Sequence, residues 1–237
     1  ITPKPNSTIE DFKKLAEKNI KDYRKKYIKY FDINKKKVKD KKTMLDTSPR
    51  VILVQNVGLF SVGDSLDAAK IAGDLTETNA RVISSVEETS KYKFIPEKDL
   101  FDVEYWSLEQ AKIKKAKKIL QGNVVVITGS FGAIGSATYK LFKSHGAEVI
   151  LLDYNLQKVK EMKLKLKELC LHCDVTNKDS VKKAFEIISK QYGGIDILIS
   201  NAGTAIGGSI AEVDDKILRQ SFEDNFFSHQ NCASEAI

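Results

Sequence analysis

The sequence predicts an α/β protein whose second half is a doubly wound parallel sheet, truncated after its fourth strand. From Asn123 onward, strand-sized apolar runs alternate with stretches of helical periodicity. This alternation is typical of βαβ units with right-handed crossovers. A glycine-rich turn joins the first of these strands directly to the first helix. A smaller α/β segment, rich in lysine, precedes the sheet.

In the first half, apolar residues at three- and four-residue spacing predict an amphipathic helix whose lysines occupy the opposite face. Ser7 and Glu10 have capping-box spacing at its start. We expect its apolar face to pack on a second helix, which Asp64 or Ser65 would cap. The predicted elements are a helix over 7–31, a polar connector over 32–50, strands over 51–54 and 59–62, a helix over 65–88, an aromatic-rich linker over 91–106 that docks on a neighbour, and a helix from Ser107 to about 120.

The second half is predicted to hold four strands with helices between them. These are strands over 123–128, 148–153, 169–173 and 195–200, helices over 134–145, 155–168 and 177–191, and a further helix from about Val213. We therefore divide the chain into residues 1–90, a linker and helix over 91–121, and a sheet domain over 122–237.

The net charge of +7 is unevenly distributed. Residues 1–50 carry +9 and the remainder carries −2, and only four basic residues are arginines. Nucleic-acid grooves usually combine arginine with aromatic residues. A lysine-rich helix face is more often a solvated surface, so we predict a scaffold and no nucleic-acid partner.

Other classes of protein are also disfavoured. No apolar stretch approaches the roughly 18 residues of a membrane span, so no membrane partner is predicted. The chain begins at Ile1 without a signal-peptide pattern, and we expect a cytoplasmic protein cut from something longer. Cys170 and Cys173 match C-x-x-C, but no second pair of ligands accompanies them. We interpret both as small apolar residues of a buried strand and predict no metal site.

The segment 128–135 follows a strand and opens a helix, which is the context that a dinucleotide fingerprint requires. Gly129 would permit the tight turn, Gly132 would leave room for a pyrophosphate, and Gly135 would let the helix approach the sheet. Asp153 ends the next strand, 18 residues after Gly135. A carboxylate there accepts hydrogen bonds from ribose hydroxyls, although it could instead cap the next helix.

From Asn123 onward the chain resembles the short-chain dehydrogenase/reductase family, which implies a Rossmann-type sheet. The family's T-G-x-x-x-G-x-G motif is matched except that Ala133 replaces its middle glycine. The segment 173–175 resembles the one whose Asp binds the adenine amino group, and 196–203 resembles the fourth strand with its N-A-G motif. Asn225 falls where the family's active-site Asn holds a water in the proton relay, although it could be an ordinary polar helix residue.

The resemblance and the glycine pattern together define the predicted site. Asn225 is the candidate catalytic residue. The predicted cofactor-binding residues are Gly129, Ser130, Phe131, Gly132, Ala133, Ile134, Gly135, Asp153, Asp174, Val175, Asn201, Ala202 and Gly203. We predict NAD rather than NADP, because Asp153 repels a 2′-phosphate and no cation stands at Ser130, Phe131 or Tyr154 to neutralise one.

The family's catalytic Ser and Tyr-x-x-x-Lys pair follow the N-A-G motif, and these residues lack them. Two strings of that spacing, Tyr139 with Lys143 and Tyr154 with Lys158, precede the motif. We reject both as chance matches in a lysine-rich chain. Alcohol oxidation is therefore not expected of these residues alone.

The first half resembles the junction of a known fusion, in which a class II aldolase domain precedes a short-chain dehydrogenase (the rhamnulose-1-phosphate aldolase/alcohol dehydrogenase proteins). The matching stretches are 22–31, 49–63 and most specifically 96–110. The resemblance implies an NAD-dependent enzyme acting on a small alcohol or aldehyde, such as lactaldehyde or a sugar-derived carbonyl.

Two other functions stay open. One is an aldolase-class bifunctional enzyme whose metal site lies upstream, and the other is a non-catalytic nucleotide-binding or assembly module. We also expect the strand over 195–200 to leave an apolar edge, and the helix from Val213 to expose an apolar face at Ile217, Leu218, Phe222 and Phe226. Because the family uses that helix as a subunit interface, a homo-oligomer is predicted.

Overall fold

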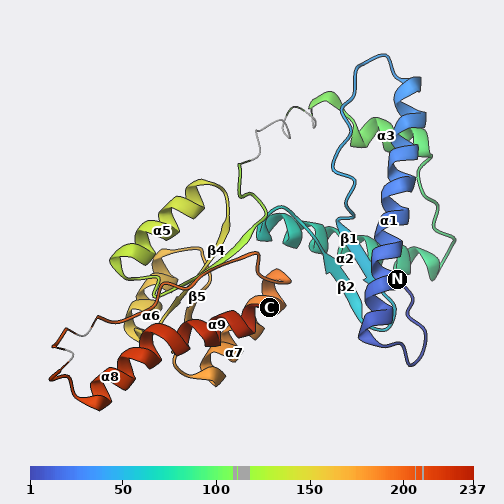
Figure 1. The fold of residues 1–237 in the computed structure, drawn as a ribbon. Coiled ribbons are helices and arrows are strands. Elements are labelled where there is room, and N and C mark those ends of the chain that lie inside the picture. The colour runs from blue at the N-terminus through green and yellow to red at the C-terminus, as the bar shows by residue number, and fades with distance from the viewer. Residues whose placement is uncertain (109–110, 112–117, 206, 210) are drawn as a thin grey trace. The chain divides into compact units, whose positions relative to one another are not determined.

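The computed structural model describes residues 1–108, 111, 118–205, 207–209 and 211–237 (Figure 1). The chain divides into two compact units, Ile1–Ala116 and Lys117–Ile237, which are treated separately below. Most of the helix predicted from Ser107 lies outside the described residues. Within the described residues, no helix is long and apolar enough to cross a membrane.

In its described residues, the first unit contains α-helices, a short 3-10 helix and a β-hairpin. Its elements are α1 (Ile9–Asn34), a short 3-10 helix (Lys35–Lys37), β1 (Val51–Val54), β2 (Gly58–Ser61), α2 (Leu66–Glu87) and α3 (Glu97–Glu104). The capping box of α1 is formed by Thr8 and Asp11, one residue later than predicted. The predicted cap of α2 is confirmed, because the Ser65 side chain accepts a hydrogen bond from the Ala68 amide.

The core of the first unit joins α1 to α3. Phe31, Phe101 and Tyr105 are buried together. The Tyr27 hydroxyl donates to the Glu104 carboxylate at 2.6 Å and also contacts the Tyr105 hydroxyl at 2.7 Å. The predicted linker over 91–106 thus contains a helix, and its residues Phe101 and Tyr105 pack within their own unit. Phe94 and Trp106 are 80 % and 55 % exposed, so the expected docking does not extend to them. The aromatic end of the α1 apolar face packs on α3, whereas the periodicity had pointed to the helix over 65–88.

The second unit is a four-stranded parallel sheet with helices on both faces. Its elements are β3 (Val124–Thr128), α5 (Ala133–Ser144), β4 (Glu148–Asp153), α6 (Leu156–Lys165), β5 (Cys170–His172), α7 (Lys178–Tyr192), β6 (Ile197–Ile199), α8 (Asp215–Phe222), a π-helical segment (Glu223–Phe227) and α9 (Ser228–Ala236). The strand order is β5-β4-β3-β6. The predicted α/β class and alternation are confirmed.

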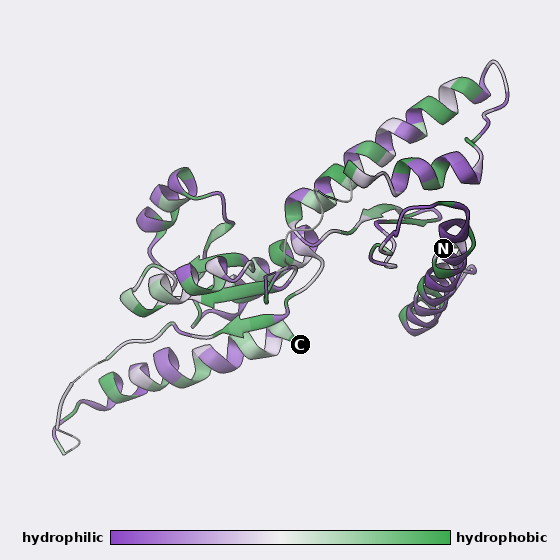
Figure 2. Cartoon of the chain, turned by 90° about the horizontal axis from the view of Figure 1, so that it is seen from above, coloured by the Kyte–Doolittle hydropathy of each residue, from purple (hydrophilic) through white to green (hydrophobic). Residues whose placement is uncertain are grey.

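Alternate residues of the strands face opposite sides of the sheet. Val126 and Ile150 pack with residues of α7 and α9 in one core cluster. Ile127 and Leu151 pack with residues of α5 and α6 in another. The central strands are hydrophobic along their length (green in Figure 2), as expected for a parallel sheet covered on both faces.

At one end of the sheet order, β6 pairs with β3, and its residues are only partly buried. Of the four apolar residues predicted to be exposed on the helical run after it, Ile217 is 41 %, Phe222 56 % and Phe226 62 % exposed, whereas Leu218 is partly buried. The carboxyl ends of β3 and β6 lie side by side. The chain leaves β3 through α5 to β4 on one side and returns from β5 through α7 to β6 on the other side of β3. This reversal is the topological switch point where such sheets bind ligands.

Candidate functional site

The glycine-rich turn after β3 is shaped by close backbone contacts. Gly129 has φ of +58°, a conformation that favours glycine, and a Cβ atom there would lie 2.9 Å from Ala202 Cα. A Cβ atom on Gly135 would lie 2.8 Å from Ser130 Cα. The turn therefore sits tightly against both the N-A-G segment and the start of α5. The amides of Ser130, Phe131 and Gly132 are hydrogen-bonded within the protein. An anionic group is therefore favoured at the first amides of α5, which have no intrahelical partner, and at the positive end of that helix.

Asp153 connects the glycine-rich turn to the end of β4. Its Oδ2 accepts a hydrogen bond from the Phe131 amide at 2.9 Å, and its Oδ1 accepts one from the Asn155 amide at 2.9 Å. Each carboxylate oxygen has a second lone pair and can accept a further bond. The cap of α6 is Asn155, whose side chain accepts from the Lys158 amide. Capping therefore does not account for the position of Asp153.

Thr128 fixes the N-A-G segment beside the turn. The Thr128 side chain is fully buried, and its Oγ1 accepts hydrogen bonds from the amides of Asn201 and Ala202, both at 3.0 Å. The Asn201 side chain donates in return to the carbonyl oxygens of Thr128 at 3.0 Å and Gly129 at 3.2 Å. This network crosses from β6 to β3 and sets one wall of a cavity.

The turn after β5 forms the opposite wall. Asp174 Oδ1 accepts from the Thr176 amide at 3.0 Å and from the Thr176 hydroxyl at 2.7 Å. The Asp174 amide donates to the Ser180 hydroxyl at 3.0 Å. Within the described residues Asp174 Oδ2 accepts no hydrogen bond, so it is free to accept one from a ligand.

These segments surround a cavity of about 820 Å³, which is large enough for at least one nucleotide of a dinucleotide. It is lined by the predicted residues Gly129, Phe131, Gly132, Ala133, Ile134, Asp153, Asp174, Val175, Asn201, Ala202 and Gly203. Ser130 and Gly135 lie behind the turn and do not line it. The structure thus gathers most of the predicted set around one space, from elements up to 73 residues apart.

Asn225 does not line this cavity. It lies in the π-helical segment, and its Oδ1 accepts from the Thr204 amide at 3.0 Å. Its Nδ2 donates to the carbonyl oxygens of Thr204 and Ser221, both at 2.9 Å. The amide therefore clamps the chain just after the N-A-G motif. The proton-relay role that the resemblance implies for Asn225 stays a prediction.

Several residues that line the cavity are absent from the predicted cofactor-binding set. They are Tyr154, Lys158, Cys173, Thr176, Thr204, Gln220 and Asp224. Lys158 brings a positive charge into the space that Asp153 lines, and its place in the first turn of α6 was the available signal. The Asp224 carboxylate accepts from the Thr204 hydroxyl at 2.7 Å and from the Gln220 amide at 2.8 Å. These three hydrogen-bonded residues line the cavity together with Gly203.

The first rejected Tyr-x-x-x-Lys string has a structural explanation. Lys143 forms an ion pair with Glu168 at 3.0 Å. Burial and the negative charge of Glu168 raise the pKa of Tyr139 to about 12, which is opposite to what a general acid–base tyrosine needs. The second string, Tyr154 with Lys158, lines the cavity beside Asp153. Tyr154 also contacts the His172 ring, with centroids 6.0 Å apart.

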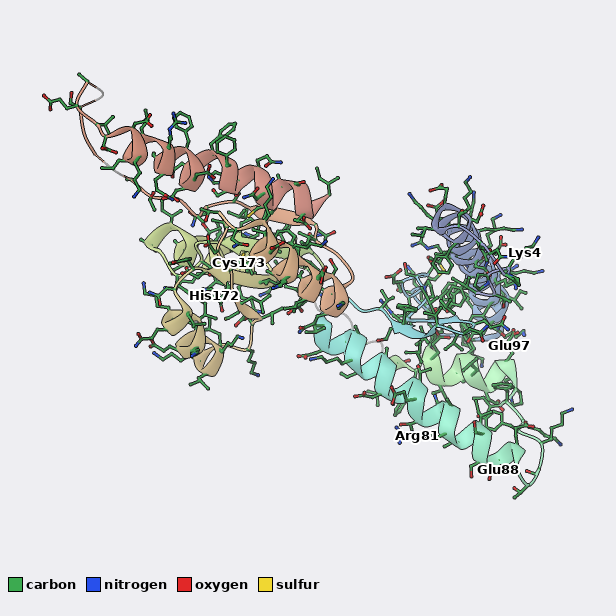
Figure 3. The ribbon with its side chains drawn as sticks, turned by 90° about the horizontal axis from the view of Figure 1, so that it is seen from below. Lys4, Arg81, Glu88, Glu97, His172 and Cys173 are labelled. Carbon is green, nitrogen blue, oxygen red and sulfur yellow. The ribbon has the colours of Figure 1, made fainter. Side chains whose placement is uncertain are left out.

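The thiols near the site are buried and unpaired. Cys170 and Cys173 are each 1 % exposed, and Cys173 follows His172 directly (both labelled in Figure 3). Burial raises the pKa of each thiol to about 11. Within the described residues, no group of three or more His, Cys, Asp or Glu side chains is placed to hold a metal.

Comparison with known proteins matches the two halves separately. Residues 1–113 match the family model described as aldolase class II, second domain. Residues 123–237 match the model described as short chain dehydrogenase. The boundary between the two matches lies close to the division between the two structural units.

The match to this chain covers only part of the length of each relative. The uncharacterized oxidoreductase YuxG of Bacillus subtilis (strain 168) is 29 % identical over 219 residues, covering 87 % of this chain and 31 % of the relative. The (+)-borneol dehydrogenase 1 of Salvia officinalis is 35 % identical over 99 residues, covering 41 % of this chain and 38 % of the relative. Among solved structures, the aldohexose dehydrogenase of Thermoplasma acidophilum matches with a TM-score of 0.44 and 32 % identity, covering 48 % of this chain and 42 % of that one. This chain thus spans less than half of the length of each of these three proteins.

Proposed function

Since residues 1–113 match the family model of the aldolase class II second domain and residues 123–237 match that of the short-chain dehydrogenases, we propose that the chain is part of an enzyme that transfers hydride between NAD and a small alcohol or aldehyde. The observation that carries this proposal is the cavity itself. It brings the glycine-rich turn, the carboxylate of Asp153 and the free oxygen of Asp174 together at the carboxyl ends of the strands. These groups suit the pyrophosphate, the ribose and the adenine of a dinucleotide in turn.

The residues present fit this cofactor by their chemistry. Amides at the start of α5 would hold the pyrophosphate, and Asp153 would accept from the ribose hydroxyls. Asp174 Oδ2 would accept from the adenine amino group. When bound, the nicotinamide supplies the hydride acceptor or donor. The chain's own contribution is to bind and orient it, with Thr128 and Asn201 holding the cavity wall in place.

The choice of NAD over NADP depends on two opposed charges. Asp153 repels a 2′-phosphate, while Lys158 in the same cavity attracts one. We propose that Asp153 dominates, because it ends β4 and is held by two backbone amides, whereas Lys158 is exposed on a long flexible side chain. The substrate we propose is a lactaldehyde-like or sugar-derived carbonyl, since aldol cleavage releases such fragments and an aldolase-type domain is joined to this one.

The test is a titration of the protein with NADH and NADPH, followed by nicotinamide fluorescence. We expect NADH to bind more tightly, and we expect Asp153→Ala to reverse or abolish that preference by about tenfold or more, since it removes the repulsion and leaves Lys158. Asn155→Ala is the matched control, because it alters the neighbouring cap of α6 and not the carboxylate. Equal binding of both cofactors, or a preference unchanged in Asp153→Ala, would contradict the proposal.

We also propose that the protein works as a cytoplasmic homo-oligomer. The support is the exposed apolar face of α8 and the π-helical segment, which includes Ile217, Phe222 and Phe226. Apolar faces of this kind commonly mark subunit interfaces.

A further inference from the structure

Asn231 is a buried polar residue that no part of the predicted site includes. It lies on the inward face of α9 with Ser228 and Cys232, and it is 6 % exposed. Its Nδ2 donates to the carbonyl oxygens of Val175 at 3.1 Å and Thr176 at 3.5 Å. Because carbonyl oxygens only accept hydrogen bonds, the amide nitrogen must be the atom that faces them. Asn231 therefore ties α9 to a turn 56 residues earlier in the chain.

The amide oxygen of Asn231 is in an energetically unfavourable environment. Within the described residues, its Oδ1 is buried and has no hydrogen-bond partner. A buried polar atom without a partner costs free energy that an apolar side chain of the same volume would avoid. The benefit of asparagine at this position therefore lies in its donor group and in the turn that the donor holds.

That turn is the wall of the cavity where Asp174 presents its free oxygen. Asp174 closes the turn onto Thr176, and Ser180 of α7 holds the Asp174 amide. Asn231 holds the carbonyl side of the same turn from α9. With the turn held by two helices, Asp174 Oδ2 keeps a fixed direction toward the cavity.

The helical run from α8 to α9 also holds the opposite wall. Asn225 clamps Thr204 by its backbone, and the ring of His229 contacts the Ser200 hydroxyl at 2.5 Å. With Asp224, which accepts from the Thr204 hydroxyl, four side chains of this run thus reach the segments after β5 and β6. Of these, Asn231 alone reaches the turn after β5, so its effect on a ligand should be confined to that side.

We propose that Asn231 is a positioning residue for the adenine half of the bound dinucleotide, which rests on the dinucleotide binding proposed above. It acts through the turn at 174–176 and does not touch the cofactor. Loss of the donor lets this turn move, so the contact between Asp174 and adenine weakens. Contacts to the nicotinamide half, on the far wall, are unaffected.

The experiment compares whole and half cofactors on the same protein. Dissociation constants are measured for NADH and for reduced nicotinamide mononucleotide by fluorescence, and for AMP by competition with NADH. In Asn231→Leu, which keeps the number and branching of the side-chain heavy atoms and removes the donor, we expect AMP and NADH to bind about tenfold more weakly. Reduced nicotinamide mononucleotide should change by less than twofold. Gln230→Leu is the matched control at the exposed neighbouring position and should change none of the three.

The outcomes separate the two proposals. Wild-type protein that binds no NADH contradicts the dinucleotide function itself. If wild type binds NADH but Asn231→Leu binds AMP equally well, the positioning role is wrong. An equal loss of AMP and mononucleotide binding also overturns it, because that pattern indicates a general change of the fold. Thermal melting of the variant, followed by circular dichroism, accompanies each titration so that unfolding is seen directly.

Discussion

The buried hydroxyl of Thr128 offers a sharp test of how the two central strands are joined at the site. Its Oγ1 accepts from the amides of Asn201 and Ala202, both at 3.0 Å, and the side chain is fully buried. Thr128→Val keeps the shape and removes the acceptor. Two amides are then left without a partner, at about 1 to 1.5 kcal/mol each because both residues are only partly buried. The expected loss is about 2 to 3 kcal/mol.

Hydrogen–deuterium exchange measures this loss where it occurs. In Thr128→Val, amides of β6 and the N-A-G segment should exchange about 30- to 150-fold faster, the factor that corresponds to about 2 to 3 kcal/mol of opening free energy. Thr128→Ser keeps the hydroxyl and should change exchange by less than about tenfold, since it removes one methyl group. The single tryptophan, Trp106, lies in the first unit, and its fluorescence should not respond.

Two results would refute the reasoning. Exchange in Thr128→Val that stays within threefold of wild type would mean that the two hydrogen bonds contribute nothing to holding β6. Equal acceleration in Thr128→Ser and Thr128→Val would mean that packing of the methyl group, and not the acceptor, stabilises the segment.

Two further predictions concern the second unit. Because burial raises the pKa of the Cys170 and Cys173 thiols from 9.0 to about 11, the folded state disfavours their ionised forms, so stability is intact below pH 9 and falls as pH rises from 9 to 11. The urea midpoint by circular dichroism should drop between pH 8 and 10.5, with a smaller drop in Cys173→Ala, and an identical midpoint at both values would contradict this. If the apolar face of α8 is a subunit interface, the double variant Phe222→Asp, Phe226→Asp should have a lower mass by light scattering. The control Arg81→Asp, on the exposed face of α2, should keep the wild-type mass. An unchanged mass in the double variant would rule out this face as the interface.

The fold of the second unit follows from local sequence patterns. The apolar runs at β3, β4 and β5 and the helical periodicity between them depend on residues within one element. The turn of Gly129 is equally local, because its φ of +58° favours glycine wherever the chain bends in this way. The position of Asp153 also follows from its place at the end of a strand. These features were therefore predictable before any contact between elements was known.

The first unit shows where local patterns are insufficient. The segment 91–106 has aromatic residues and no long helical period, and it was predicted as a linker. Phe101 of α3 and Tyr105 at its C-terminal cap nevertheless form a hydrophobic core with Phe31, which lies about 70 residues earlier in the sequence. The energy that orders this segment comes from a tertiary partner, and the segment itself gives no sign of which helix that partner is.

In the candidate site, the residue types at the carboxyl ends of the strands can be predicted from the amino-acid sequence, whereas the contacts that hold them there arise only in the folded protein. Lys158 enters the cavity because only two residues separate the end of β4 from the start of α6. Asn231 reaches Val175 because α9 packs on the face of the sheet that also carries α7. Such bonds join residues far apart in the chain, and their partners are fixed only when the helices pack on the sheet. Short-range periodicity carries no information about that packing.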